Sequence, residues 1–426
     1  MAYKVTIVGG GVSGLYLAFL LNDFYEKDEI LLIERSNRVG GRIYTSKKTI
    51  GNQQYTYESG AGRFCKDHNL LWELIDLFKL TNSVVANGTK TTYINNNKVI
   101  NGPDNRGIHQ IIIDSINIYN ELGRGDLILT NYNIDQLCQK LVKYNCMTRD
   151  EYKWCKFAYP YYPCFKVMNA KIFIILLQQQ ETSPFFGLKG GLSQLVDKLK
   201  SSMSNVKILL QTEISEIKSI DKRYFLTSKG NTFTSDKLIL AIPPHSLQLI
   251  SIPRNILKCD LTDMIGSCPL SRIYAVYPKN DDGKVWFHNL GRIITDNDLK
   301  YIIPINQETG LIMISYLNGT AASRLNDKLL DGGSLKKIIK NDVDKLFPEL
   351  EIPEPIFIDE NYWSVGTHYY KPDCDPNVVQ DKINQPNINK PVWLIGESYS
   401  IYSGWIEGSL NSAYTAFLKI IEGLSL

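Results

Sequence analysis

A glycine-rich turn near the start of the chain restricts the fold more than any other stretch of the sequence. The apolar run Val5–Val8 leads directly into Gly9-Gly10-Gly11-Val12-Ser13-Gly14, and apolar residues at helical spacing follow. This order predicts a strand, a tight turn and a helix. Gly9 would bend the chain, Gly11 would let the backbone approach a pyrophosphate, and Gly14 would let the helix pack against the strand. The start of the helix would then face the phosphates with free N–H groups.

A second apolar run supports the interpretation of this turn as a nucleotide-binding motif. The run Glu29–Ile33 ends at Glu34, an acidic residue that follows Gly14 by about 20 residues, as in dinucleotide-binding folds. There its carboxylate could accept hydrogen bonds from both ribose hydroxyls. The same carboxylate would repel a 2′-phosphate, so the sequence disfavours an NADP-type ligand and predicts a dinucleotide without that group.

The length and composition indicate a globular protein with two interleaved domains. The chain has 426 residues, of which 44% are hydrophobic and 21% charged, and its net charge is +3. This length is too great for one ordinary core. The basic residues are scattered, which gives nucleic-acid binding little support. The eight cysteines include no Cys-x-x-Cys pair and no accompanying histidine cluster, so we expect reduced thiols and no metal site.

The sequence also bears on the compartment. The chain enters its first strand by Tyr3 without an apolar stretch and cleavage signal, so no secretory peptide is expected. The longest apolar run, Ile172–Leu177, is far too short to span a bilayer. We therefore expect a soluble cytoplasmic protein.

Helical and strand patterns alternate along the rest of the chain. Helical spacing covers 69–80, and helical patterns alternate with aromatic turns over a predicted helical insertion at about 95–186. The aromatic residues of the turn Ala158–Phe165 are expected to pack in the core more often than to contact a ligand. Strands are expected at 206–210, 213–217, 224–227 and from 236 to the two prolines at 243–244. A second sheet is expected from 271–277 and 311–317, and a last strand, loop and helix from 392 to 409.

The segment after Glu34 indicates which dinucleotide is bound. Arg35-Ser-Asn-Arg-Val-Gly-Gly-Arg42 resembles the glycine-glycine-arginine segment of flavin-dependent amine oxidases, in which the arginine meets the FAD phosphates. The resemblance extends along almost the whole chain, because three further motifs of that superfamily follow in the same order. They are Gly187-Leu-Lys-Gly-Gly191, Gly396-Glu397 and Gly404-Trp405-Ile406-Glu407-Gly408.

The resemblance implies an α/β fold in which a Rossmann-type FAD-binding domain is interleaved with an α+β substrate domain containing a mixed sheet and the helical insertion. The FAD-binding domain would comprise 1–66, 187–265 and 385–426, and the substrate domain 67–186 and 266–384. Ile214 would contact the adenine through its backbone, and Glu397 the ribityl or ribose hydroxyls. The residues expected at the non-covalent FAD are Gly9, Gly11, Val12, Ser13, Gly14, Glu34, Arg35, Gly41, Arg42, Gly60, Ala61, Gly62, Arg63, Ile214, Gly396, Glu397, Trp405, Ile406 and Ser409.

Two features are similar to the L-amino acid oxidase branch of the superfamily. Glu58-Ser-Gly-Ala-Gly-Arg-Phe64 is similar to the segment whose arginine binds the substrate carboxylate, although Gly62 replaces a methionine. Arg63 would supply a planar, bidentate fork for that carboxylate; the alternative is that it contacts the flavin or closes a structural ion pair. Trp405 matches the tryptophan that walls the substrate slot. The resemblance thus implies oxidation of a small-molecule amine, in particular an L-amino acid, to an imine by hydride transfer to flavin N5, with O2 or another acceptor taking the electrons.

Three positions depart from the family pattern. Thr367 stands where monoamine oxidases carry the cysteine bonded to FAD, so no covalent link is expected. His368 stands near an aromatic-cage position and joins Arg63, Arg272 and Trp405 as a candidate catalytic residue. Arg272 falls where many members have a lysine that holds a water at flavin N5, so rapid reoxidation by oxygen is not expected.

The sequence leaves other functions open. One is a polyamine or monoamine oxidase or a protoporphyrinogen-oxidase-like dehydrogenase, which Arg63 disfavours because an amine without a carboxylate would leave its charge unpaired. Another is a flavin-binding protein with little oxidase activity, which Arg272 favours.

Overall fold

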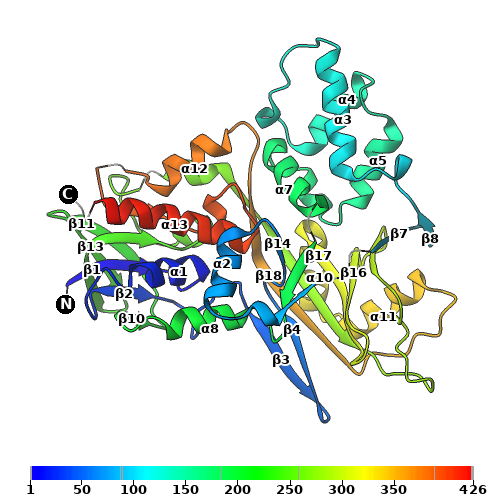
Figure 1. Cartoon of the computed structure of the whole chain (residues 1–426), viewed down its shortest axis with the longest axis horizontal. Coiled ribbons are helices and arrows are strands. Elements are labelled where there is room, and N and C mark those ends of the chain that lie inside the picture. The colour runs from blue at the N-terminus through cyan, green and yellow to red at the C-terminus, as the bar shows by residue number, and fades with distance from the viewer. Residues whose placement is uncertain are drawn as a thin grey trace.

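A computed structural model describes residues 2–86, 88, 90–182, 184–257, 259–387 and 389–423. Two large sheets lie side by side, and a group of helices lies above the second sheet in this view (Figure 1). The fold is mixed α/β and confirms the predicted fold class.

The first sheet contains the N-terminal glycine turn. Its strands follow the order β10 (Val206–Leu209), β2 (Ile30–Ile33), β1 (Ala2–Val8), β13 (Asn231–Leu240), β12 (Arg223–Ser228) and β11 (Glu216–Ile220), and β19 (Val392–Leu394) also pairs with β13. Strand β1 is parallel to both β2 and β13, and β2 is buried along its whole length, as expected for a parallel strand covered on both faces. Helices α1 (Val12–Leu21), α8 (Ser193–Ser201) and α13 (Ile406–Glu422) share one apolar core with these strands (Figure 1).

The second sheet is largely antiparallel. Its order is β18 (Phe357–Tyr370), β14 (Ile265–Val276), β17 (Leu311–Asn318), β16 (Tyr301–Asn306), β15 (Arg292–Thr295), β7 (Thr91–Asn95) and β8 (Lys98–Ile100). Helices α10 (Gly319–Leu330) and α11 (Leu335–Leu346) pack on it through Ala322, Ile339 and Val343. The strands of the first sheet come from the ranges predicted for the FAD-binding domain, whereas β14 begins one residue before the predicted boundary at 266. The domain division stays a prediction.

The helical insertion comprises α3 (Ile108–Glu121), α4 (Ile134–Lys143), α5 (Arg149–Ala158), α6 (Tyr162–Phe165) and α7 (Ala170–Thr182). Asn133 and Thr148 start α4 and α5 with capping boxes, in which side chain and backbone groups satisfy each other. The predicted start at about 95 is wrong. The hairpin β7–β8 occupies residues 91–100 and joins the second sheet through β15, so the helices begin only at Ile108.

One predicted strand was also misplaced. The strand expected at 213–217 is β11, which begins at Glu216. The reason is that Gln211 and Thr212 donate their backbone N–H groups to the carbonyl oxygens of Ser36 and Glu34, so this segment follows the loop after β2 before it joins the sheet.

Smaller elements complete the fold. They are the hairpin of β3 (Thr45–Ile50) and β4 (Gln53–Glu58), the sheet of β5 (Phe64–Cys65), β9 (Phe185–Leu188) and β6 (Val84–Ala86), the helices α2 (Asn69–Leu77), α9 (Pro244–Leu247) and α12 (Pro376–Asn384), and the short 3-10 turns at Thr81–Ser83, Pro103–Asn105, Leu129–Asn131, Cys259–Met264 and Glu397–Tyr399. Glu407 of α13 accepts hydrogen bonds from the backbone N–H groups of Leu70 and Leu71, which fixes the start of α2 against α13.

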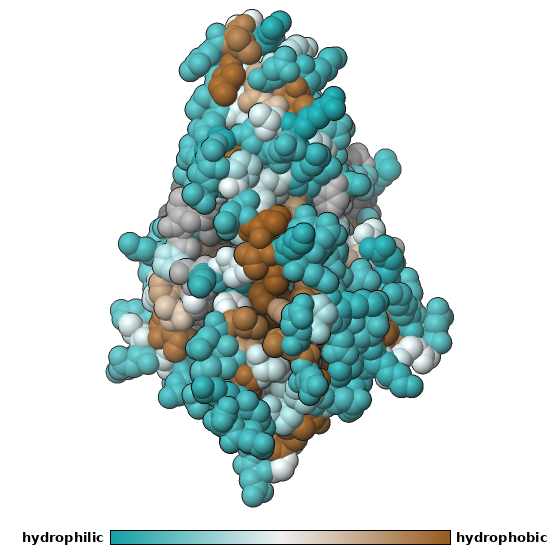
Figure 2. Space-filling view, turned by 90° about the vertical axis from the view of Figure 1, so that its right-hand side faces the viewer, coloured by the Kyte–Doolittle hydropathy of each residue, from teal (hydrophilic) through white to brown (hydrophobic). Residues whose placement is uncertain are grey.

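The surface is mostly hydrophilic. Figure 2 shows one face of the molecule, on which apolar residues gather in a narrow central strip with hydrophilic residues on both sides. Within the described part of the chain, no helix is both long and apolar enough to cross a membrane.

Candidate cofactor and substrate site

A cavity of about 580 Å³ lies where the parallel strands of the first sheet end. Its lining includes Gly9 after β1, Glu34 after β2, Ala241 after β13 and Ile395 after β19. Ligands of open α/β sheets bind in this crevice, beyond the carboxyl ends of the strands. The opposite walls come from the second sheet and the helical insertion, so the cavity joins all three parts of the fold.

The structure brings almost all predicted cofactor residues to this one cavity. Those that line it are Gly9, Gly11, Val12, Ser13, Glu34, Arg35, Gly41, Arg42, Gly60, Ala61, Gly62, Arg63, Ile214, Gly396, Glu397, Trp405, Ile406 and Ser409. The exception is Gly14, which lies behind the turn. A Cβ on Gly14 would stand 2.1 Å from the carbonyl oxygen of Gly9, so Gly14 permits the close packing of helix and strand that the motif predicted.

The glycine turn leaves room for a ligand. Gly9 has a positive φ of 109°, and a Cβ there would lie 2.4 Å from the carbonyl oxygen of Ala241. A Cβ on Gly11, by contrast, would meet nothing within 4 Å, so this backbone faces open space at the start of α1. The second glycine loop lies against the first, with the N–H of Gly40 donating to the carbonyl of Gly10 at 2.7 Å. This bare backbone beside a helix N-terminus fits the phosphates of a dinucleotide.

Glu34 lines the same end of the cavity. Its Oε2 accepts a hydrogen bond from the N–H of Gly10 at 2.8 Å, and its Oε1 accepts from the N–H and hydroxyl of Ser36, each at 2.8 Å. Arg38, which the sequence analysis did not single out, donates to the carbonyl oxygens of Val39, Gly41 and Ile43 and so holds the loop in shape. Contact of Glu34 with a ribose stays a prediction.

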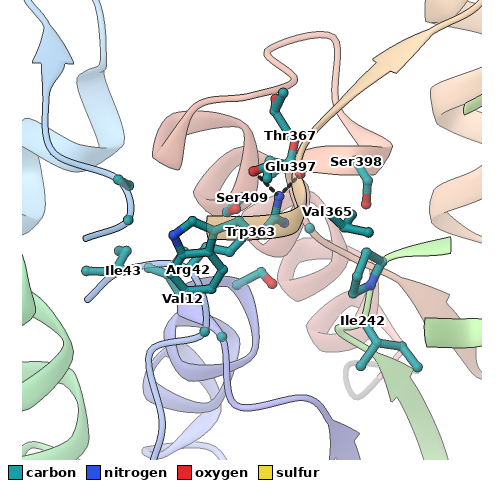
Figure 3. Close-up of a pocket in the computed structure, with 18 of the residues that line it drawn as sticks. Val12, Arg42, Ile43, Ile242, Trp363, Val365, Thr367, Glu397, Ser398 and Ser409 are labelled. Carbon is teal, nitrogen blue, oxygen red and sulfur yellow. Dashed lines mark hydrogen bonds and ion pairs between the residues drawn. The ribbon is translucent and has the colours of Figure 1, made fainter. Parts of the chain in front are cut away.

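A buried carboxylate joins distant segments in the middle of the cavity. Glu397 Oε1 lies 2.6 Å from Arg42 Nη1 and 2.5 Å from His368 Nδ1, and Oε2 accepts from the N–H of Gly404 at 2.7 Å. Figure 3 shows Arg42 pointing to Glu397. Burial alone would raise the pKa of Glu397, but Arg42 and His368 outweigh burial and hold this pKa well below its usual range. Glu397 is therefore a stable anion.

His368 is the one candidate catalytic residue that does not line the cavity. Its side chain is buried, with a residue exposure of 2%, and it lies against Glu397. The cavity lining from β18 runs from Tyr362 to Thr367 and ends there, and the next residue, His368, lies behind it against Glu397. This placement corrects the expectation of an aromatic-cage position and makes His368 a positioning residue for Glu397.

Arg63 lines the other end of the cavity. Its Nη2 donates to the hydroxyl of Tyr161 at 2.8 Å, and its guanidinium stacks over the ring of Phe185 at 4.3 Å. Among the described residues, no carboxylate lies within ion-pair distance of Arg63, and the residue keeps part of its surface exposed. Burial on its own would lower the pKa of Arg63. The phenol groups of Tyr161 and Tyr301 outweigh burial and raise this pKa above its usual value, so the side chain stays charged.

Arg272 is held more tightly than Arg63. Its Nη1 donates to the carbonyl oxygen of Glu58 at 3.2 Å and its Nη2 to the hydroxyl of Tyr316 at 3.3 Å, and its guanidinium lies 4.7 Å from the centre of the Tyr316 ring. Burial would raise the pKa of Tyr316, but Arg272 and Arg63 lower it below its usual value. Arg272 and Tyr316 thus form one polar unit on the cavity wall.

Aromatic side chains complete this end. The ring of Trp405 stacks on Phe185 with centroids 6.0 Å apart and meets His68 edge to face at 4.9 Å. Arg63 and Trp405 therefore both pack against the ring of Phe185. Trp363 donates its indole N–H to the carbonyl oxygen of Ser59 at 2.7 Å and fixes the loop that leads to Arg63.

Sequence reasoning missed several residues of the site. In the aromatic turn at 158–165, the expected core packing holds for Phe165, whereas Tyr161 lines the cavity and binds Arg63. Tyr316 and Trp363 also line the cavity and were not predicted. For Tyr161, the cluster of tyrosines in the turn was a signal that could have indicated a site residue. For Tyr316 and Trp363 there was no such signal, because strand periodicity does not show which face of β17 or β18 meets a cavity.

Comparison with known proteins identifies the family. The family model for flavin-containing amine oxidoreductases matches residues 12–416. The chain belongs to this family. Its members use FAD, and the open glycine backbone at Gly11 fits the phosphates of that cofactor. FAD is therefore the cofactor of this protein. Thr367 lies on the cavity wall and carries no thiol, and non-covalent binding stays our prediction.

Three similar proteins illustrate the range of the family. The "Corticosteroid-binding protein" of Candida albicans is 26% identical over 272 residues, which are 58% of this chain and 53% of that protein. "L-amino-acid oxidase 4" of Hebeloma cylindrosporum is 44% identical over 61 residues, or 14% of this chain and 9% of that protein. The chain thus spans about half of the first relative and a small part of the second. The solved structure of cyclohexylamine oxidase from Brevibacterium oxydans has the same fold, with a TM-score of 0.76, 17% identity and 100% coverage of both chains.

Proposed function

We propose that this FAD-dependent oxidoreductase oxidises an L-amino acid to the corresponding imine. Membership of the amine oxidoreductase family supports the reaction type. The observation that carries the choice of substrate is Arg63, a charged guanidinium on the cavity wall that has no carboxylate partner among the described residues.

The charge of Arg63 favours a substrate with a carboxylate. A cation that is taken out of water costs free energy unless an anion or several acceptors compensate it. Tyr161 supplies one acceptor, but a substrate carboxylate could accept two parallel N–H groups of the guanidinium and cancel its charge. An amine without a carboxylate would instead bring a second positive charge into the same cavity, which Coulomb repulsion opposes.

The proposed roles follow from the arrangement of the side chains. Bound FAD supplies a two-electron acceptor for the hydride of the substrate Cα–H, and the protein supplies orientation. Arg63 binds the carboxylate, and Trp405 limits the slot on the side that Phe185 supports. Arg272 organises water or substrate at the wall formed with Tyr316.

The substrate class is tested by anaerobic reduction of the bound flavin. L-amino acids, amines without a carboxylate such as cyclohexylamine and spermine, and a porphyrinogen are mixed separately with the FAD-loaded protein, and the flavin absorbance is recorded. We expect bleaching by one or more amino acids. Bleaching by simple amines or a porphyrinogen alone would overturn the proposal, and bleaching by none of these compounds would support a flavin-binding protein with little oxidase activity.

The role of Arg63 is tested by Arg63→Lys. Lysine retains the charge but loses the planar fork, so KM for the amino acid should rise about tenfold or more, while the FAD content stays the same. Arg292→Lys is the matched control, because Arg292 also stacks on Phe185, at 5.3 Å, yet is not part of the cavity lining. An Arg63→Lys protein that purifies without flavin would assign Arg63 to the cofactor.

A further inference from the structure

Two thiols meet at the wall of the cofactor cavity. Cys164 lies on the short helix α6 and Cys268 on strand β14, and their Sγ atoms are 3.7 Å apart. Both residues are buried, with exposures of 4% and 5%. Cys164 lines the cavity, and Cys268 pairs across the sheet with Thr367, which lines it as well. The pair therefore lies at the cofactor cavity, although neither thiol has a part in the proposed amine oxidation.

The polar surroundings of this pair are unusual for buried cysteines. Asn318, another residue of the cavity wall, directs its side-chain N–H to Cys164 Sγ at 3.1 Å. The hydrogen bond from Cys164 lowers the pKa of Cys268, even though burial would raise it. Burial raises the pKa of Cys65 to about 12 and that of Cys374 to about 11, so those thiols stay protonated. The same hydrogen bond and burial raise the pKa of Cys164, so of the two thiols Cys268 is the one that gives up its proton more readily.

We propose that Cys164 and Cys268 form a redox-active pair that closes to a disulfide by reducing FAD bound in the same cavity. The two S–H bonds break and one S–S bond forms. The two electrons and two protons released convert oxidised FAD to its two-electron reduced form, and an external dithiol reopens the bridge. The sulfur atoms must approach from 3.7 Å to about 2.0 Å. The short helix α6 is the element that would move, because β14 is paired on both sides.

Closure of this bridge would affect the substrate end of the cavity. The two cysteines are 104 residues apart in sequence, and the bond would tie the helical insertion to the second sheet. Tyr161, whose hydroxyl accepts the hydrogen bond from Arg63, directly precedes α6. A shift of α6 toward β14 therefore alters the support of Arg63, so the thiol redox state would adjust the binding of the substrate.

The test follows both sulfur and flavin in the FAD-loaded full-length protein. The thiols are reduced with a phosphine, the phosphine is removed without oxygen, and the flavin absorbance is recorded in the absence of any amine. Peptide mapping without reductant then measures the Cys164–Cys268 bond. We expect slow bleaching of the flavin together with a matching yield of this bond. Cys164→Ser and Cys268→Ser should abolish both signals, and Cys374→Ser, which alters a buried thiol away from the cavity, should leave both unchanged.

Flavin-free protein shows whether FAD is the oxidant. Without oxygen it should form no bond between Cys164 and Cys268. Formation of the bond at the same rate without flavin would overturn the proposal, and so would two thiols that remain open to alkylation while the flavin stays oxidised. Peptide mapping of the wild-type protein decides the matter even where a serine variant fails to fold.

Discussion

The two ends of the cavity are built in different ways. At the nucleotide end, two neighbouring loops supply the glycine backbone and Glu34, and backbone N–H groups already satisfy the charge of this carboxylate. At the substrate end, Arg63, Tyr161, Arg272 and Tyr316 come from separate elements spread over much of the chain. There the charge of Arg63 has no carboxylate partner within the described residues. The carboxylate of the first end already has hydrogen-bond donors within the protein, whereas the second end leaves one positive charge for the substrate to compensate.

Because the two ends differ in this way, substitutions at each end should have separable effects. Changes at the nucleotide end should alter the amount of FAD bound, and changes at the substrate end should alter kinetics in protein that remains fully loaded with FAD.

The largest effect is expected from Gly11→Leu. The new side chain would enter the open space beside α1, and the backbone of Gly11, at φ −69° and ψ 177°, accepts any residue. We expect FAD affinity to fall more than about 1,000-fold, or ~4 kcal/mol, while circular dichroism shows an intact fold. Equilibrium titration of flavin-free protein with FAD measures the change. Normal affinity would mean that the cofactor does not approach this backbone.

Glu397→Gln should cause the next largest loss. The substitution leaves Arg42 and His368 without their shared anion, and breaking a buried ion pair of this kind costs about 3 kcal/mol of unfolding free energy. Chemical denaturation at neutral pH measures the loss. Glu407→Gln is the matched control, because Glu407 is also buried on α13 but has no cation in its hydrogen-bond set.

The pH dependence of stability provides a second measure of Glu397. Its folded-state pKa lies below its unfolded value of about 4.3, so its contribution is complete above that value and is lost as the pH falls toward the folded pKa. Wild-type protein should therefore lose stability below about pH 5 more steeply than Glu397→Gln. Glu407→Gln should not flatten this acid limb, because burial raises the pKa of Glu407. Parallel acid limbs for wild type and Glu397→Gln would contradict the anion assigned to Glu397.

A smaller effect is expected from Glu34→Ala. Loss of the carboxylate removes the acceptor for the N–H groups of Gly10 and Ser36 as well as the proposed ribose contact, at a cost of about 1–3 kcal/mol in FAD binding. Titration with FAD measures it, and kcat of protein saturated with FAD should hardly change. Unchanged affinity would place the ribose elsewhere.

The smallest effect is expected from Arg272→Lys at the substrate end. A lysine presents a compact charge that can hold one water, whereas the Arg272 guanidinium is already bound to Glu58 and Tyr316. We expect reoxidation by oxygen to become faster by a few fold, about 1 kcal/mol, with flavin reduction little changed. Stopped-flow measurement of the two half-reactions decides this. Fast reoxidation in the wild type, or no change in the variant, would show that Arg272 does not limit the oxygen reaction.

The same difference explains what the sequence could predict. The nucleotide end was predictable because its signals are local: the turn at 9–14 and the loop at 34–42 show their spacing in a short stretch of chain. Tyr161 and Tyr316 could not be predicted, because their role depends on how the insertion and β17 meet across the cavity. His368 was misjudged because the cavity lining of β18 ends at Thr367, and its ion pair with Glu397, 29 residues later, leaves no local signal.

Prediction of the fold from the sequence was limited in the same way. Buried parallel strands such as β2 were predicted well, because short continuous apolar runs identify them. The predicted helical insertion began inside the hairpin β7–β8 and included β8, because the partner strand β15 lies about 200 residues later and leaves no local signal. Residues 213–215 were predicted as strand although β11 begins only at Glu216, because the preceding Gln211 and Thr212 donate to loop carbonyls.

The cavity lining also has a consequence for the protein in the cell. Residues next to β1, β2, β13 and β19 face the same cavity, so one FAD molecule bound there would contact segments that span nearly the entire chain. Ligand that binds only the folded state stabilises it by mass action, by about 2.7 kcal/mol when the free ligand is at 100 times its dissociation constant. FAD supply would therefore increase the resistance of this protein to proteolysis, and flavin starvation would lower both the fraction of active protein and its lifetime.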